Sequence, residues 1–128
     1  MRKLLVLAVA LSLVSATGAA ARNVRPSGPP QFPNLPGNWS HAEINVKIKG
    51  VPHTLILDRG RITQALPTQL KLRESDGNSV TIPLAPSTIV TYRGPLRRTM
   101  PALRRGFYVE TMIIDAGSAV RVLVLRRR

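Results

Sequence analysis

Apolar and polar residues alternate along much of this sequence, and that alternation restricts its fold more than any other feature. The aliphatic residues Ala42, Ile44, Val46 and Ile48 alternate with polar residues. Successive side chains of a strand point to opposite faces, so this pattern predicts a half-buried strand. Similar short stretches follow at 54–57, 61–65, 70–74, 80–84, 88–91, 107–114 and 119–125. The chain is therefore expected to be all-β, with six or seven short strands.

One hairpin can be predicted in register. A three-residue loop ending at Gly77 pairs Leu72 with Val80 and Leu70 with Ile82, so that the apolar side chains share one face. A two-residue loop would place these apolar residues opposite polar ones, which burial of one face disfavours. Gly77 is then expected to take the positive φ of a turn that ends in a bulge.

Two further glycines are predicted to be structural turn residues. Gly60 follows an Asp-Arg pair that should interrupt the strand material between 54 and 65. Gly106 ends residues 99–106, which have the pattern of a one- or two-turn helix with a threonine N-cap and a proline in the first turn. A sheet this small protects its edges best by closing, so we expect a closed or partly open barrel with one short helix.

The N-terminal third indicates export. Residues 1–21 combine a basic start, an apolar run and an Ala-x-Ala site, which is typical of a signal peptide, although an uncleaved membrane anchor is the alternative. Residues 22–38 contain five prolines and few apolar side chains, so a disordered linker is expected there. Residues 39–128 then form the folded domain. Its expected location is the periplasm, the cell wall or the exterior.

Composition argues against several kinds of chemistry. The 128 residues include no cysteine, which excludes disulfides, thiolate metal sites and thiol nucleophiles. No G-x-S-x-G or S-x-x-K motif is present, and Asp58 and Asp115 are expected to cap turns. His41 and Glu43 point the same way on one strand and His53 could approach them, but zinc or copper needs more ligands. We therefore expect no enzyme activity, no cofactor and no metal site; a periplasmic copper carrier is the least favoured alternative.

The positive charge is the strongest pointer to a partner. The chain carries 19 Lys and Arg against 6 Asp and Glu, and most of the basic residues are arginine, which binds phosphate and carboxylate groups in a bidentate manner. We expect Arg97, Arg98, Arg104 and Arg105 to form a patch, extended by Arg93 and residues 126–128. Such a patch would bind an anionic envelope polymer or an acidic lipid surface.

Two other interpretations stay open. The charge could only keep a small exported domain soluble, or the domain could hold another envelope protein through a sheet edge or the Pro-rich arm. Aromatic residues make up 4% of the chain, so sequence-specific binding of nucleic acid is not expected.

Residues 55–125 resemble an uncharacterised domain family of exported bacterial proteins. The resemblance is carried by the stretches 57–62, 70–77, 80–84, 87–90 and 102–106, which read LDRGRI, LKLRESDG, VTIPL, STIV and ALRRG. It implies a small barrel of the oligonucleotide/oligosaccharide-binding (OB) type and brings no assigned activity, cofactor or catalytic residue. The matching residues Gly60, Gly77, Leu103 and Gly106 would be structural.

Overall fold

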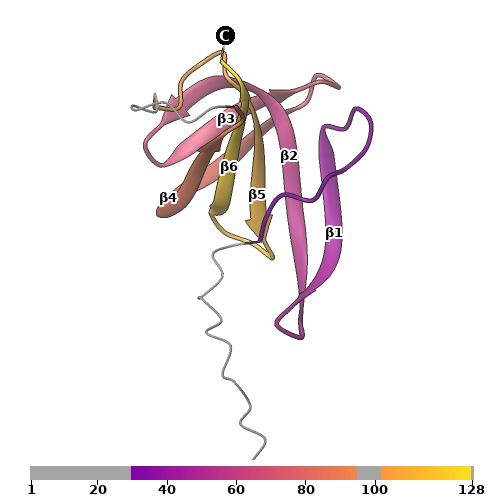
Figure 1. Ribbon diagram of the computed structural model, residues 1–128. Coiled ribbons are helices and arrows are strands. Elements are labelled where there is room, and N and C mark those ends of the chain that lie inside the picture. Colours follow the sequence, from indigo (N-terminus) through magenta and orange to yellow (C-terminus); the bar gives the residue numbers. More distant parts are fainter. Residues whose placement is uncertain (1–29, 95–101, 128) are drawn as a thin grey trace, which may run out of the picture.

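The protein is an all-β structure, as expected. The computed structural model describes residues 30–94 and 102–127, and Figure 1 shows their arrangement. Six strands are present: β1 (His41–Ile48), β2 (Val51–Leu66), β3 (Gln69–Glu74), β4 (Ser79–Tyr92), β5 (Tyr108–Ile114) and β6 (Ala119–Arg126). Within these two ranges no residue belongs to a helix, and hence none to one that could cross a bilayer.

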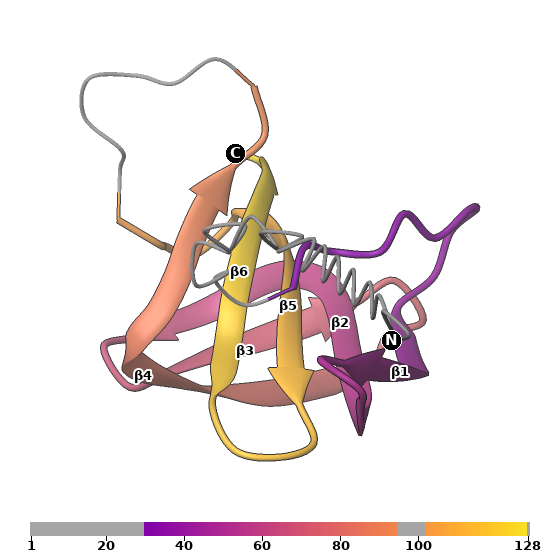
Figure 2. The same cartoon turned by 60° about the horizontal axis from the view of Figure 1, so that its bottom comes forward.

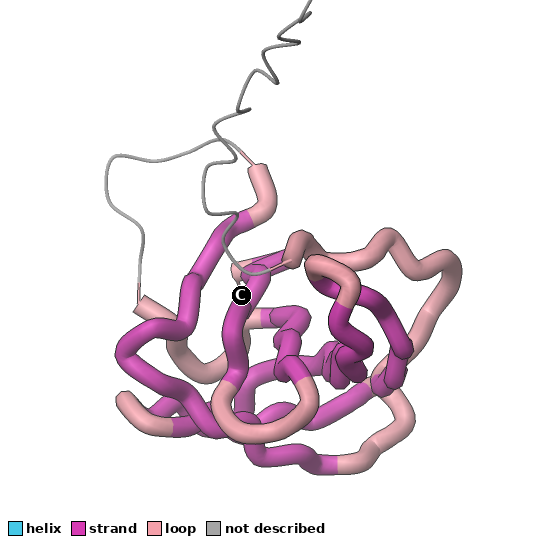
Figure 3. Tube along the Cα trace, turned by 90° about the horizontal axis from the view of Figure 1, so that it is seen from below, coloured by secondary structure: helices cyan, strands magenta, loops and turns pink. Residues whose placement is uncertain are grey.

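Five of the strands pair in a closed ring. The second half of β2 pairs with β3, β3 pairs with β4, and β4 runs parallel to β6. β6 then pairs antiparallel with β5, which returns to β2 (Figure 2, Figure 3). β1 lies outside this ring and pairs only with the first half of β2 among the described strands (Figure 1).

β2 is continuous through residues 58–60, so the predicted interruption there was wrong. Asp58 and Gly60 both pair with β5, opposite Thr111 and Val109, and this pairing keeps the backbone extended. Gly60 is thus not a turn residue. A Cβ atom at Gly60 would lie 2.6 Å from the carbonyl oxygen of Arg73 on β3, so the residue is needed for close approach of two backbones. The stretches at 80–84 and 88–91 likewise belong to one strand, β4.

The predicted hairpin is confirmed. Leu70 pairs with Ile82 and Leu72 with Val80. Closer to the loop, the amide of Glu74 donates to the carbonyl of Asn78, and three residues separate these two. Gly77 has a φ of 91°, as the turn requires. Three of the four aliphatic side chains in the two pairs are fully or almost fully buried, which explains why this register is selected.

The predicted helix at 99–106 is not found over its described part, residues 102–106. The backbone here pairs with β2 instead: the amide of Gly106 donates to the carbonyl of Ile62, and the amide of Ile62 donates to the carbonyl of Phe107, both at 2.8 Å. Amides and carbonyls that pair with a strand cannot also form helical bonds. Gly106 does lie in a turn, with a φ of 95°. Residues 99–101 lie outside the described residues.

Hydrophobic side chains form two clusters. The larger draws on all five strands of the ring and includes Ile62, Leu72, Ile82, Val109 and Val122. The smaller lies on the opposite face of β2 and β5, around Leu55, Leu57 and Met112, and is covered by β1 and by Phe32, Leu35 and Trp39. The linker expected over 22–38 is therefore part of the folded domain from at least Phe32 onward, because its few apolar residues cover this second cluster. The predicted signal peptide, residues 1–21, and residues 22–29 of the predicted linker lie outside the described residues.

Substituting Gly60 should test the close approach of β2 and β3. Gly60→Ala is expected to lower the free energy of unfolding by about 2–3 kcal/mol, because backbone atoms must move to admit the Cβ. Gly77→Asn, where the space is open and asparagine tolerates positive φ, should cost less than about 1 kcal/mol. Urea unfolding followed by circular dichroism measures both. Equal losses would contradict this assignment of the two glycines.

Candidate functional site

Three arginines and a tyrosine lie in one row across four strands. Arg61 on β2 is the direct partner of Arg73 on β3 and of Tyr108 on β5. Tyr108 is in turn the partner of Arg126 on β6. Directly opposed residues of antiparallel strands project from the same face, so these four side chains form a continuous surface. We call Arg61, Arg73, Tyr108 and Arg126 the arginine row.

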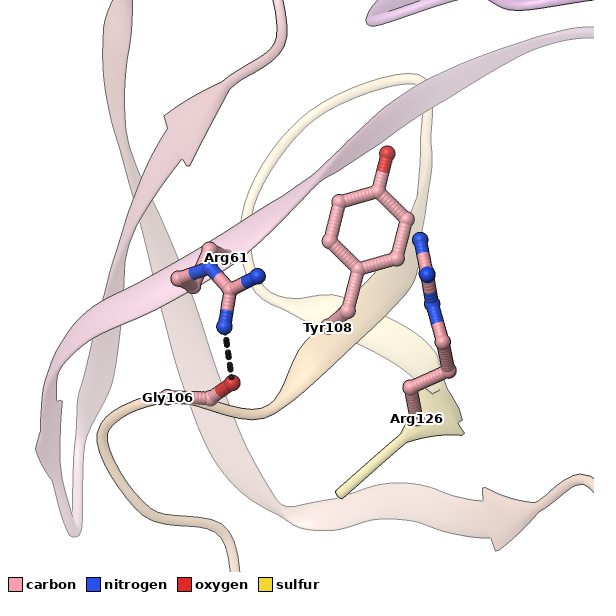
Figure 4. Close-up of a pocket in the computed structure, with 4 residues that line it drawn as sticks. All are labelled: Arg61, Gly106, Tyr108 and Arg126. Atoms are coloured by element: carbon pink, nitrogen blue, oxygen red, sulfur yellow. Dashed lines mark hydrogen bonds between the residues drawn. The ribbon is translucent and has the colours of Figure 1, made fainter. Parts of the chain in front are cut away.

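Contacts within the row hold two of its side chains in place. The guanidinium of Arg126 lies over the ring of Tyr108, 5.0 Å from its centroid, and Arg61 donates a hydrogen bond to the carbonyl of Gly106 at 3.1 Å. Figure 4 shows Arg61 and Arg126 on either side of Tyr108. These residues line a hollow of about 160 Å³. A second hollow, of about 430 Å³, lies between Tyr108 and Arg73 and is lined by Arg61, Thr63, Arg73, Glu74, Ser75, Gly77 and Tyr108.

The arginines of the row form no ion pair with a carboxylate in the part of the chain that the structure describes. Ion pairs within the described residues join Arg59 to Glu110, His41 to Asp58 and Glu43, and His53 to Asp115. None of these pairs includes Arg61, Arg73 or Arg126, all three of which are exposed. The row is therefore a positively charged strip that is open to an anionic ligand.

The arginine patch expected from the sequence is only partly described. Arg97 and Arg98 lie outside the described residues. Arg104 and Arg105 are exposed on the segment that leads into Gly106, next to the row, and the guanidinium of Arg104 lies 5.5 Å from the centroid of Phe107. Sequence reasoning included Arg126 but missed Arg61 and Arg73. Only the register between β2 and β3, which the sequence did not provide, places these two side by side.

A second group of polar residues lies at the edge of β2, beside the first residue of β1 and the last residue of β3. His41 is paired with Asp58, and Glu74 is paired with Gly60, so all three side chains project from one face. One donor atom from each of His41, Asp58 and Glu74 lies within 4.8 Å of the other two. Asp58 is 3% exposed and Glu74 is 8% exposed. The expectation that Asp58 caps a turn was therefore wrong, because it lies in mid-strand.

Burial and hydrogen bonding change the acidity of this cluster. His41 Nδ1 lies 2.7 Å from Asp58 Oδ1, and this hydrogen bond is the main reason why the pKa of His41 is raised. The pKa of Glu74 is raised as well, first because burial disfavours the charged carboxylate and second because the Asp58 carboxylate lies nearby. Glu74 Oε1 is buried and has no hydrogen-bond partner. Two buried carboxylates thus lie beside one imidazole, and the imidazole is hydrogen-bonded to Asp58.

The other histidine belongs to a separate pair. His53 Nδ1 lies 2.7 Å from Asp115 Oδ2, and Asp115 also accepts a hydrogen bond from the amide of Thr54 at 2.9 Å. Both contacts lower the pKa of Asp115, with that of Thr54 first. Asp115 lies in the turn between β5 and β6, as predicted, and the backbone amide from which its carboxylate accepts belongs to Thr54 on β2. Because His53 precedes Asp58 by five residues on an extended strand, it lies about 16 Å from Asp58 along β2 and does not approach His41.

Comparison with protein-family models, with curated proteins and with solved structures found no match to this chain.

The pKa shifts of His41 and Glu74 predict that stability falls as pH rises. The folded protein favours the protonated forms of both groups. The contribution of each group to folding stability is therefore complete below its ordinary pKa and is lost as the pH rises through its raised pKa in the folded state. The ordinary pKa is 6.5 for His41 and 4.5 for Glu74. The midpoint temperature of thermal unfolding, measured with EDTA to exclude metal ions, should decrease between about pH 5 and 8. The substitution Glu74→Gln should make this midpoint depend less steeply on pH. A midpoint independent of pH would contradict both assignments.

Proposed function

We propose that this protein is a non-enzymatic, exported domain with an OB-like barrel that binds an anionic envelope polymer through the arginine row. The observation that carries the proposal is the alignment of Arg61, Arg73 and Arg126 beside Tyr108, without an ion pair to any carboxylate of residues 30–94 and 102–127. Export is inferred from the signal-like residues 1–21. An acidic lipid surface offers related phosphate chemistry, but a row across four strands suits an extended chain better.

The strand connections support an OB-like barrel. The ring consists of a three-stranded meander, β2-β3-β4, closed by β5 and β6, with β4 and β6 parallel. A five-stranded Greek-key ring of this kind is the arrangement of OB folds, which bind oligonucleotides and oligosaccharides on the outside of the sheet. This topology also agrees with the resemblance to the uncharacterised exported family. Fold alone does not specify a ligand, so the ligand class is inferred from the side chains of the row.

The row suits an anionic chain because its cations are evenly spaced and because contacts hold Arg61 and Arg126 in place. Neighbouring strands lie about 4.8 Å apart, so the row from Arg73 to Arg126 spans about 14 Å across three strand intervals. Each guanidinium can donate two parallel hydrogen bonds to one phosphate, sulfate or carboxylate group. Tyr108 offers one flat ring for stacking. A single ring cannot read a sequence of bases, and sequence-specific binding of nucleic acid is not proposed.

A protein–protein assembly role is the second candidate. β1 has one neighbour among the described strands, so its second edge presents unpaired amides and carbonyls along His41–Ile48. Such an edge can accept a strand from another protein. Contacts of this type depend on backbone hydrogen bonds and apolar side chains, and salt should weaken them little. The copper carrier is not favoured, because His41 and His53 do not converge.

Retention on heparin and on single-stranded DNA, measured against salt, tests the polymer proposal. The logarithm of the binding constant should fall linearly with that of salt, and the double variant Arg73→Ala/Arg126→Ala should reduce the slope by about 2. The matched control is Lys47→Ala/Lys49→Ala, which removes the same charge at the opposite end of β2. Its slope should stay close to that of the wild type.

Two outcomes would overturn the proposal. If both double variants lose retention equally, only net charge matters and the row is not a site. If retention is weak and unchanged by Arg73→Ala/Arg126→Ala, the anionic ligand class is wrong. Recovery of a partner protein from envelope extract that is unaffected by salt, and lost when β1 is altered, would favour the assembly role.

A further inference from the structure

Two buried carboxylates lie against each other at the edge of β2 with one histidine to balance them. The ion pairs within the described residues bring only His41 to Asp58, and they bring no cation to Glu74. Buried acidic groups are normally paired with a cation, coordinate a metal or lose their charge. Glu74 Oε1 is buried without any hydrogen-bond partner and belongs to a side chain that lines this cluster. This oxygen is therefore available to a ligand.

We propose that His41, Asp58 and Glu74 bind one divalent transition-metal ion of the zinc type. The three side chains offer one nitrogen and two oxygen donors, from three different strands, within 4.8 Å of one another. Donors around zinc lie about 2.0–2.2 Å from the ion, hence about 3.4 Å apart in a tetrahedron, so rotations of the side chains are enough to close the site. Imidazole with carboxylates favours zinc over the hard ions calcium and magnesium, which prefer all-oxygen sites.

The backbone leaves space for this convergence. Glu74 is paired with Gly60, which has no side chain, and Asp58 is the next residue of β2 on the same face. A larger residue at Gly60 would collide with β3. The side chain of His41 is 48% exposed, so the ion can enter from solvent past the imidazole.

A neighbouring carboxylate can orient the histidine. His41 Nδ1 faces Asp58, while Nε2 lies 3.6 Å from Glu43 Oε1. With the metal on Nδ1, the proton stays on Nε2 and can be donated to Glu43 after a small movement. A carboxylate that accepts from the second ring nitrogen is the usual companion of a metal-bound histidine, because it fixes the tautomer and the ring. The site borders the arginine row, because Glu74 also lines the second hollow, but neither proposal depends on the other.

Isothermal titration of the metal-free full chain with Zn²⁺ tests this site. The wild type should bind one equivalent, and Glu74→Gln and His41→Gln should each weaken binding by at least about tenfold. The matched control is His53→Gln, because His53 forms the same 2.7 Å contact with Asp115. This control should bind like the wild type. Ca²⁺ and Mg²⁺ in excess should not displace Zn²⁺.

Thermal unfolding distinguishes the loss of a metal-binding side chain from the loss of folding stability. Without metal, Glu74→Gln should unfold at a higher temperature than the wild type, since it removes a buried acid that repels Asp58. Zn²⁺ should raise the wild-type midpoint and leave that of Glu74→Gln almost unchanged. The proposal is wrong if the wild type does not bind Zn²⁺, if Glu74→Gln binds it equally well, or if His53→Gln loses as much as His41→Gln.

Discussion

The pairing of β2 with three other strands is the constraint on which the rest of this structure depends. Along one edge β2 accepts first β1 and then β3, and along the other edge it accepts β5. The change from β1 to β3 occurs at residues 58–60, where Gly60 brings the backbones of β2 and β3 together. This position closes the ring and also brings His41, Asp58 and Glu74 to one place. Both candidate sites depend on it, because Arg61 follows Gly60 directly.

Charge is unevenly distributed over the molecule. Asp58, Glu74 and Glu110 are buried, whereas Arg61, Arg73 and Arg126 are exposed. Glu110 is paired with Arg59, whose guanidinium also lies over the ring of Trp39 at 4.1 Å from the centroid. Trp39 thus covers an ion pair on the outer face as well as the smaller hydrophobic cluster. A strongly basic chain therefore keeps half of its few acids away from the surface that would meet an anionic ligand.

Local patterns predicted the elements that depend on neighbouring residues. The strand at 42–49, the register of the β3–β4 hairpin and the positive φ of Gly77 all follow from alternation and turn chemistry over a few residues. The predicted break at Asp58-Arg59-Gly60 was wrong, because turn-forming residues remain extended when neighbouring strands on both edges bind their amides and carbonyls. The predicted helix was wrong over 102–106 for the same reason, since that backbone pairs with β2.

The sequence by itself determined the all-β class, the local hairpin and the excess of positive charge, because each is a property of composition or of short-range periodicity. Tertiary structure alone decided which charged side chains meet. Arg61 and Arg73 are neighbours through the register of β2 with β3, and His41, Asp58 and Glu74 converge because two strands share one edge of β2. Such contacts join residues 12 to 33 positions apart, from Arg61–Arg73 to His41–Glu74. The stabilisation that brings these residues together comes from closure of the ring and burial of the core, and no local sequence pattern encodes it.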